Sequence, residues 1–213
     1  MNKYITEFIG TFFLVLTVGL TSGMNALAIG SALMVMIYAG GHISGAHYNP
    51  AVTLAVYIRK RISLGDALIY MGCQFAGGLI AALVVSLFMH LPEVADQSTM
   101  NTGKAIMAEL FGTFALAYVV LNVATAKGNE GNSYFGLAIG FTVFAMASAL
   151  GQFSGGAFNP AVAVGLIVMN IFEGIKIWIY LLGCFGGAAI AAVVFNLNNP
   201  AEKTPAPPEA MID

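Results

Sequence analysis

Long apolar segments alternate with short polar ones along most of the chain. Six of them come close to the roughly 20 residues that a helix needs to cross the hydrocarbon core of a bilayer. They span residues 4–23, 25–43, 64–89, 104–126, 133–151 and 174–196. Two shorter apolar segments, about 50–58 and 160–170, cannot cross and are predicted to be half-membrane helices. The pattern therefore predicts an all-α membrane protein with six transmembrane helices and two re-entrant half-helices.

The second half of the chain repeats the first. The tripeptide Asn49, Pro50 and Ala51 returns as Asn159, Pro160 and Ala161, 110 positions later. Each half contains three spans, an odd number, so the second copy enters the membrane from the opposite side. We therefore predict an inverted repeat, with repeat 1 at about 1–90 and repeat 2 at about 104–196, within one transmembrane domain, 1–196. The proline-rich segment 197–213 is predicted to be a disordered tail.

Each repeated Asn-Pro pair is a helix start, with Asn as the cap and Pro as the first helical residue. Helix ends inside a bilayer are costly unless they line a polar path, so the pair indicates a pore. Asn49 and Asn159 would face one point near the midplane and offer amide donors to a water or small hydroxylated solute. The backbone before each cap is expected to be non-helical and to line the pore with carbonyls. The residues concerned are Gly41, His42, Ile43 and Ser44 in the first copy and Ser154 and Gly155 in the second.

Two acidic residues are expected to be buried within predicted spans, Glu7 and Glu109, at corresponding places in the two repeats. A carboxylate inside a membrane is a candidate proton or substrate site. Its duplication favours a structural role instead, in which each carboxylate accepts hydrogen bonds from a re-entrant loop.

His42 and His47 are five residues apart, off the spacing of a helical metal-binding pair. For His47 we favour a packing or pore-lining role, and we predict no metal site and no cofactor.

The composition excludes most soluble and nucleic-acid-binding classes. The chain is 59% hydrophobic and 8% charged, and no basic stripe is present. Basic residues near span ends are distributed unevenly, which predicts cytoplasmic termini and a multi-pass protein of the inner (plasma) membrane. The predicted cytoplasmic set is Lys3, Arg59, Lys60, Arg61, Lys127 and Lys203, against Lys104 and Lys176 outside. Cys73 and Cys184 fall within spans and are expected to be free thiols.

These motifs resemble the aquaporin (major intrinsic protein) family over about residues 3–196. The resemblance rests on the run Gly41–Thr53 (GHISGAHYNPAVT), on the second Asn-Pro-Ala and on the two Glu-x-x-Gly-Thr-Phe segments. It implies six tilted helices and two half-helices, assembled as a homotetramer with one pore per subunit. It also implies a passive channel, not an enzyme, for water and small uncharged solutes such as ammonia, urea or glycerol-like molecules, with exclusion of ions.

The family's selectivity filter falls, by spacing from the two tripeptides, on Ile29, Ala147, Gly156 and Val162. Water-selective members generally carry an aromatic residue, a His and an Arg there, and Val162 stands in the place of that Arg. The glycerol-conducting branch typically has Asp at the next position, where this chain has Ala163. The chain is therefore similar to atypical members without the Arg, whose wider filters are associated with water and small neutral solutes.

Two other classes of function remain open at this stage. A secondary carrier with alternating access can also be built from inverted repeats and broken helices. A carrier coupled to protons or sodium would be expected to have a titratable or oxygen-rich site at the midplane, where this chain offers two Asn residues. An intramembrane enzyme is the third reading, and the sequence contains no evident nucleophile or metal constellation for it.

Overall fold

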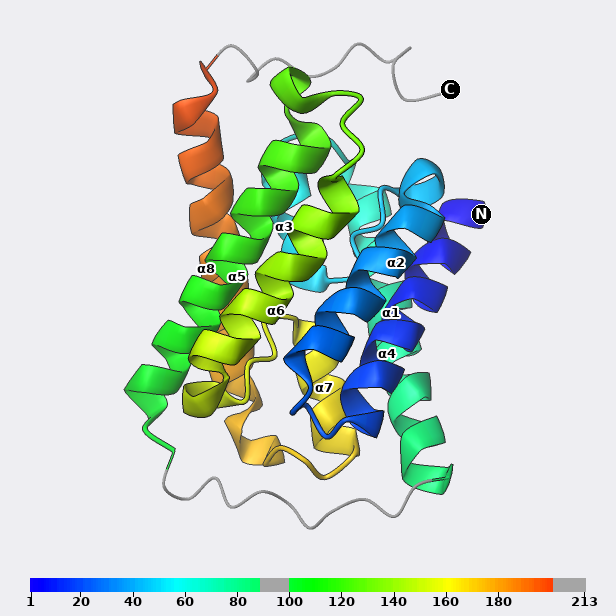
Figure 1. Cartoon of the computed structure of the whole chain (residues 1–213), viewed down its shortest axis with the longest axis vertical. Helices are drawn as coiled ribbons and strands as arrows, with labels where there is room; N and C mark the ends of the chain where they lie inside the picture. The colour runs from blue at the N-terminus through cyan, green and yellow to red at the C-terminus, as the bar shows by residue number, and fades with distance from the viewer. Residues whose placement is uncertain (89–99, 201–213) are drawn as a thin grey trace.

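A computed structural model describes residues 1–88 and 100–200, and these residues are organised as a bundle of helices (Figure 1). The six long helices are α1 (Asn2–Leu20), α2 (Ala26–Ser44), α4 (Leu64–Phe88), α5 (Thr102–Thr125), α6 (Phe135–Ser154) and α8 (Ile177–Asn198). The two short ones are α3 (Pro50–Ile58) and α7 (Pro160–Val168). Short 3-10 turns, η1 (Lys127–Asn129) and η2 (Gly174–Lys176), precede α6 and α8. All six long helices are long and apolar enough to cross a membrane, which confirms the predicted fold class.

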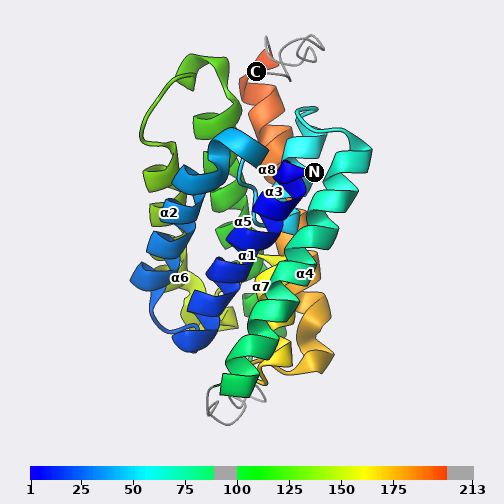
Figure 2. The same ribbon diagram turned by 90° about the vertical axis from the view of Figure 1, so that its right-hand side faces the viewer.

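The two short helices lie inside the bundle and enter it from opposite ends. In Figure 1, α3 lies in the upper half and α7 in the lower half, with their N-termini toward each other. The start of α1 and the end of α8 lie at the same end of the bundle, which we call the inner end, and Figure 2 shows the same arrangement from the side. The opposite end, with the α1–α2 connection, is called the outer end. This arrangement is the predicted inverted repeat.

Each half-helix packs against the other half of the chain: α3 contacts α8, and α7 contacts α4. The long helices approach closely at glycines. A Cβ on Gly77 of α4 would overlap the Phe8 carbonyl of α1, and a Cβ on Gly187 of α8 would overlap the Leu110 carbonyl of α5. Small residues of this kind allow membrane helices to pack closely, because association there depends on van der Waals contact.

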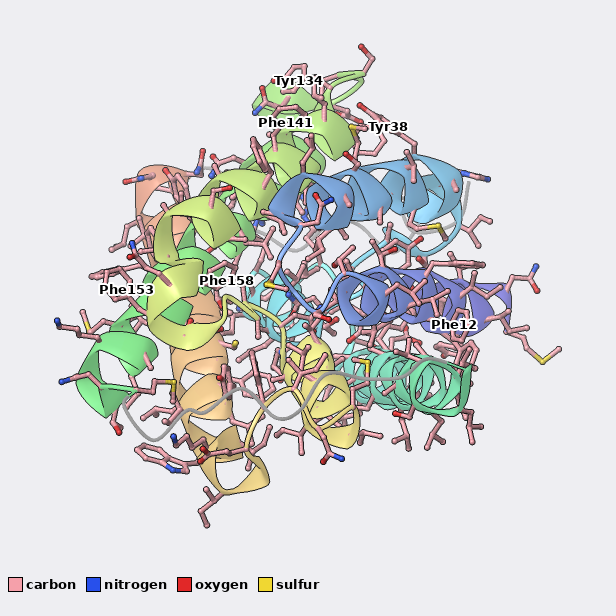
Figure 3. All side chains as sticks on the ribbon, turned by 60° about the horizontal axis from the view of Figure 1, so that its bottom comes forward. Phe12, Tyr38, Tyr134, Phe141, Phe153 and Phe158 are labelled. Atoms are coloured by element: carbon pink, nitrogen blue, oxygen red, sulfur yellow. The ribbon has the colours of Figure 1, made fainter. Side chains whose placement is uncertain are left out.

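The outside of the bundle is apolar, as a lipid environment requires. Figure 3 shows Phe141 and Tyr134 on the periphery, whereas Phe158 lies nearer to the centre, and the exposed fractions of these side chains agree. Among the six spans, α2 and α6 bury the smallest share of their residues within the chain. Their outward faces are therefore available to lipid or to other copies of the protein.

Four helix ends differ from the sequence prediction. Helix α2 continues to Ser44, so the residues from Gly41 to Ser44 are helical and the prediction of irregular backbone there was wrong. Gly40 serves close packing, because a Cβ there would overlap the hydroxyl of Tyr48, whereas a Cβ on Gly41 would make ordinary contact with the ring of Phe135. Ser154 is likewise the last residue of α6, not part of a loop. Helix α7 ends at Val168 and α8 runs to Asn198, so the predicted tail starts too early; residues 201–213 lie outside the described part of the chain.

Candidate functional site

The N-termini of α3 and α7 meet in the middle of the bundle. Oδ1 of Asn49 accepts a hydrogen bond from the N–H of Ala51 at 2.8 Å, and Oδ1 of Asn159 accepts one from Ala161 at 2.9 Å. Each proline stands at the first helical position, where its missing N–H costs nothing. The two asparagines are therefore helix caps, as the sequence predicted.

The same asparagines also tie the two half-helices together. Nδ2 of Asn49 donates to the carbonyl of Phe158 at 2.9 Å, and Nδ2 of Asn159 donates to the carbonyl of Tyr48 at 2.9 Å. Each cap thus binds the residue that precedes the other cap. An Asn amide carries two N–H groups, so this contact uses one donor of each side chain.

The loops that lead into the half-helices have nearly the same backbone in both repeats. In the inner loop, Gly45–Tyr48, the φ angles of Gly45, Ala46 and Tyr48 are 82°, 52° and 49°. In the outer loop, Gly155–Phe158, the equivalent residues Gly155, Gly156 and Phe158 have φ angles of 87°, 68° and 48°. Positive φ costs a residue with a side chain roughly 1–2 kcal/mol, so surrounding contacts must hold these loops in place.

Glu7 supplies such contacts to the inner loop. Its Oε1 accepts hydrogen bonds from the Ser44 hydroxyl at 2.7 Å and the His47 N–H at 2.9 Å. Its Oε2 accepts from the Tyr48 N–H at 2.7 Å and from Nε2 of Gln74 at 2.8 Å. The side chain is fully buried, and all four donors converge on one carboxylate.

Glu109 repeats this arrangement at the outer loop. Its Oε1 accepts from the Ser154 hydroxyl at 2.7 Å and the Ala157 N–H at 3.0 Å. Its Oε2 accepts from the Phe158 N–H at 2.7 Å and from the thiol of Cys184 at 3.4 Å. Both carboxylates therefore make the backbone hydrogen bonds that the sequence analysis expected of a structural role.

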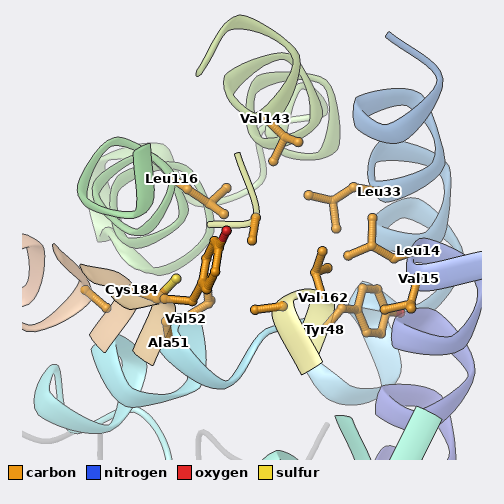
Figure 4. Close-up of a cluster of buried hydrophobic side chains, with 14 of the residues drawn as sticks. Leu14, Val15, Leu33, Tyr48, Ala51, Val52, Leu116, Val143, Val162 and Cys184 are labelled. Atoms are coloured by element: carbon orange, nitrogen blue, oxygen red, sulfur yellow. The ribbon is translucent and has the colours of Figure 1, made fainter. Parts of the chain in front are cut away.

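A narrow central cavity lies beside the paired asparagines. Its volume is about 40 Å³, counted as space for the centre of a water molecule. A water needs about 10–15 Å³ by this measure, so the cavity holds about three. Most of its wall is aliphatic, and Figure 4 shows Leu14, Leu33, Leu116, Val143 and Val162 pointing toward one another from five helices. The wall also includes Asn49, Asn159, His47, Gly155 and the four predicted filter positions, Ile29, Ala147, Gly156 and Val162.

A wider inner vestibule of about 480 Å³ opens at the inner end of the bundle. It shares His47 and Val120 with the central cavity, so the two spaces meet there. Nδ1 of His47 lies 3.1 Å from Oγ1 of Thr53, and its ring packs edge-on against Tyr70. The vestibule wall carries the charged residues Lys3, Arg61 and Asp66, whereas the central cavity wall is aliphatic apart from its few polar groups.

Comparison with known proteins identifies the family. A sequence profile for the family described as Major intrinsic protein matches residues 1–195. The chain belongs to the major intrinsic protein family. The Arabidopsis thaliana protein named Probable aquaporin NIP4-2 is 34% identical over 218 residues, covering 95% of this chain and 76% of that protein. Glycerol uptake facilitator protein-like 6 of Lactiplantibacillus plantarum is 36% identical over 208 residues, covering 90% and 95%.

A solved structure supports the fold of this family member. The X-ray structure of the aquaglyceroporin from Plasmodium falciparum superposes with a TM-score of 0.78 and covers 94% of this chain and 98% of that chain. The two sequences are 20% identical, so the likeness bears on the fold alone. The helices of this chain are thus arranged as in that structure.

Part of the predicted pore-lining set lies elsewhere. Gly41, His42 and Ile43 belong to α2, and none of them is on the wall of the central cavity or of the inner vestibule. His42 and Ile43 are exposed on the outside of the helix. Ser44 is on the vestibule wall and Ser154 is on neither wall, and the hydroxyl of each serine donates to a buried glutamate. Of the six residues, Gly155 alone lies on the wall of the central cavity.

Two further tyrosines, Tyr70 and Tyr180, hold the residues just before the loops in this family member. The sequence did not single them out. The hydroxyl of Tyr70 donates to the Ser44 carbonyl at 2.9 Å, and that of Tyr180 donates to the Ser154 carbonyl at 2.7 Å. The two residues are 110 positions apart, the offset of the asparagine pair, so the repeat contained a signal for them. Cys73 and Cys184 are free thiols, as expected.

Proposed function

We propose that the protein is a passive channel for water and small uncharged solutes, with a path through the central cavity and the inner vestibule. The observation that carries this proposal is the pair of capping asparagines beside a cavity that holds about three waters. Each amide has a second N–H that is suited to donate to the oxygen of a passing molecule. The carbonyls of the two loops provide acceptors along the same wall.

Exclusion of ions follows from the same geometry. The wall of the central cavity is mostly aliphatic, so an ion would lose its hydration without receiving a compensating charge. The N-termini of α3 and α7 converge at the asparagines, and each carries the partial positive charge of a helix dipole. Cations and protons are therefore repelled at the point where dehydration is greatest.

The outer part of the cavity is proposed as the selectivity filter, formed by Ile29, Ala147, Gly156 and Val162. With Val162 in place of a cation, this filter is less polar than one that contains Arg. It favours solutes without charge, such as ammonia, urea and glycerol-like molecules, in addition to water. The name of the Lactiplantibacillus plantarum relative supports the inclusion of glycerol, and that of the Arabidopsis thaliana relative supports water.

The inner end is proposed to face the cytoplasm of a plasma (inner) membrane. Support comes from the basic residues there, Lys3 and Arg61 among them, because cytoplasmic loops carry an excess of Lys and Arg. A homotetramer with one pore per subunit is proposed as the assembly. The exposed apolar faces of α2 and α6 support it, because they offer surface to neighbouring copies.

The test is solute flux in proteoliposomes, measured by light scattering with water, ammonia, urea and glycerol. Ala147→Trp places a large ring in the central cavity, and Leu68→Trp places the same ring on the exposed face of α4 as a matched control. We expect Ala147→Trp to abolish flux and Leu68→Trp to retain it. Flux that saturates at low solute concentration would contradict a channel and favour a carrier. Equal flux in the two variants would contradict the assigned path.

A further inference from the structure

Different residues pack against the first glycine of the inner loop, Gly45, and of the outer loop, Gly155. In repeat 1 the ring of His47 packs against Tyr70, with centroids 5.3 Å apart, and its Nε2 lies 3.5 Å from the position that a Cβ on Gly45 would occupy. In repeat 2 the equivalent of His47 is Ala157, which has no ring. Ala157 therefore cannot fill the space beside Gly155 in the way that the His47 ring fills the space beside Gly45.

Phe172 fills that space. Its ring stacks on Tyr180, with centroids 4.7 Å apart and an interplanar angle of 13°. A Cβ built on Gly155 would overlap Cζ and Cε1 of the same ring. The N–H of Phe172 donates to the Leu166 carbonyl at 3.1 Å, which fixes the residue to the end of α7. An aromatic ring from another part of the chain thus takes the place that His47 occupies in repeat 1.

The ring lies behind the outer loop and not in the path itself. Gly155, Gly156 and Ala157 are among the described residues that line the central cavity, and Phe172 is not. Both glycines have positive φ and no side chain, so the loop resists displacement only through its neighbours. Glu109 holds it by hydrogen bonds to Ala157 and Phe158, and Phe172 blocks retreat of Gly155 away from the cavity.

We propose that Phe172 is a positioning residue that braces the outer loop and thereby sets the width and solute selectivity of the outer part of the pore. This inference rests on the proposed function. The central cavity is so small that a slight retreat of the Gly155 backbone would change which solutes pass. Urea and glycerol, which are wider than water, are the solutes most sensitive to such a change.

The test compares two substitutions with opposite expected effects in reconstituted full-length protein. Phe172→Leu removes part of the brace, lets the outer loop retreat, and should raise the ratio of urea to water permeability. Phe172→Tyr adds a hydroxyl at Cζ, the atom already against Gly155, and should push the loop inward and lower that ratio. We expect the ratio of urea to water permeability to move in opposite directions in the two variants, relative to the native protein.

Phe195→Leu and Phe195→Tyr are matched controls. Phe195 is also a fully buried ring, on α8 next to Arg59, and it lies outside the described wall of the central cavity. The controls should leave the permeability ratio unchanged. Equal ratios in the Phe172 and Phe195 variants, or shifts of the same sign for Phe172→Leu and Phe172→Tyr, would overturn the inference.

A second readout does not depend on conduction. Hydrogen exchange of the N–H groups of Gly156, Ala157 and Phe158 should be faster in Phe172→Leu than in Phe195→Leu, because the braced loop opens more often. If the native protein conducts neither water nor solute, the proposed function fails. Hydrogen exchange of the outer loop then decides whether Phe172 braces it. If the native protein conducts and neither readout moves in Phe172→Leu, only the brace is refuted.

Discussion

Substitution of Glu7 by Leu or by Gln tests whether the carboxylate holds the inner loop in its strained conformation. Leu removes both acceptor oxygens and leaves the backbone N–H groups of His47 and Tyr48 buried without a partner. A buried donor left unsatisfied costs about 1–3 kcal/mol, so the two together cost about 2–6 kcal/mol. The Ser44 hydroxyl also loses its acceptor, but it can rotate toward another.

Gln retains one carbonyl oxygen, which can take the place of Oε1 and accept from Ser44 and His47. Its amide nitrogen then replaces Oε2. Gln74 can turn its own amide so that its oxygen accepts from this new donor, and only the Tyr48 N–H is left unpaired. The expected cost is about 1–3 kcal/mol, roughly half of that for Leu.

The assay is thermal unfolding in detergent, followed with a thiol-reactive dye that reports exposure of the buried Cys184. We expect the melting temperature to fall in the order native, Glu7→Gln, Glu7→Leu. The matched control is Glu130, which is exposed and outside the helices, so Glu130→Gln and Glu130→Leu should both melt like the native protein. Equal melting temperatures for the two Glu7 variants would refute the structural role and would favour a functional carboxylate.

Two further predictions concern selectivity. Asn159→Asp places a carboxylate at the converging positive helix ends, so we expect a cation leak in proteoliposomes that the native protein lacks; unchanged ion exclusion would show that the asparagine pair is not the central barrier. Val162→Arg adds a long cationic side chain to the outer wall, so urea and glycerol flux should fall while water flux persists. Unchanged urea flux in a folded Val162→Arg protein would place the filter elsewhere.

The membrane helices and the half-helices were predictable because the bilayer restricts their length. A span needs roughly 20 apolar residues, and a nine-residue run such as Pro50–Ile58 cannot cross. The hydrogen bonds of Glu7 were predictable for a related reason. A buried carboxylate needs donors, and a loop inside a membrane needs acceptors for its N–H groups, so each satisfies the other.

The contacts that position the two loops could not be predicted in the same way. The end of α2 was misjudged because Gly41 was interpreted as a loop residue, whereas it is helical and packs against the ring of Phe135. Phe172 lies in a connection after α7 and forms no motif with Gly155 or Tyr180. Which ring fills a gap depends on the packing of distant segments, and a hydrophobic pattern does not contain that information.

The two repeats have similar loop backbones but differ in side chains, so the surroundings of the two loops differ in polarity. The inner loop is flanked by the polar residues His47, Thr53 and Gln74, whereas the equivalent positions of repeat 2 are Ala157, Ala163 and Cys184. Both half-helix ends nevertheless converge at the same point, with matching caps and matching carboxylates. Under the proposed function, the central barrier to ions depends on features that both repeats supply, and it does not need a cation at position 162. Under the same proposal, the choice among neutral solutes depends on the outer half, where the aliphatic wall and the loop braced by Phe172 set the width. Exclusion of ions and choice among neutral solutes would then change independently, because they depend on different residues.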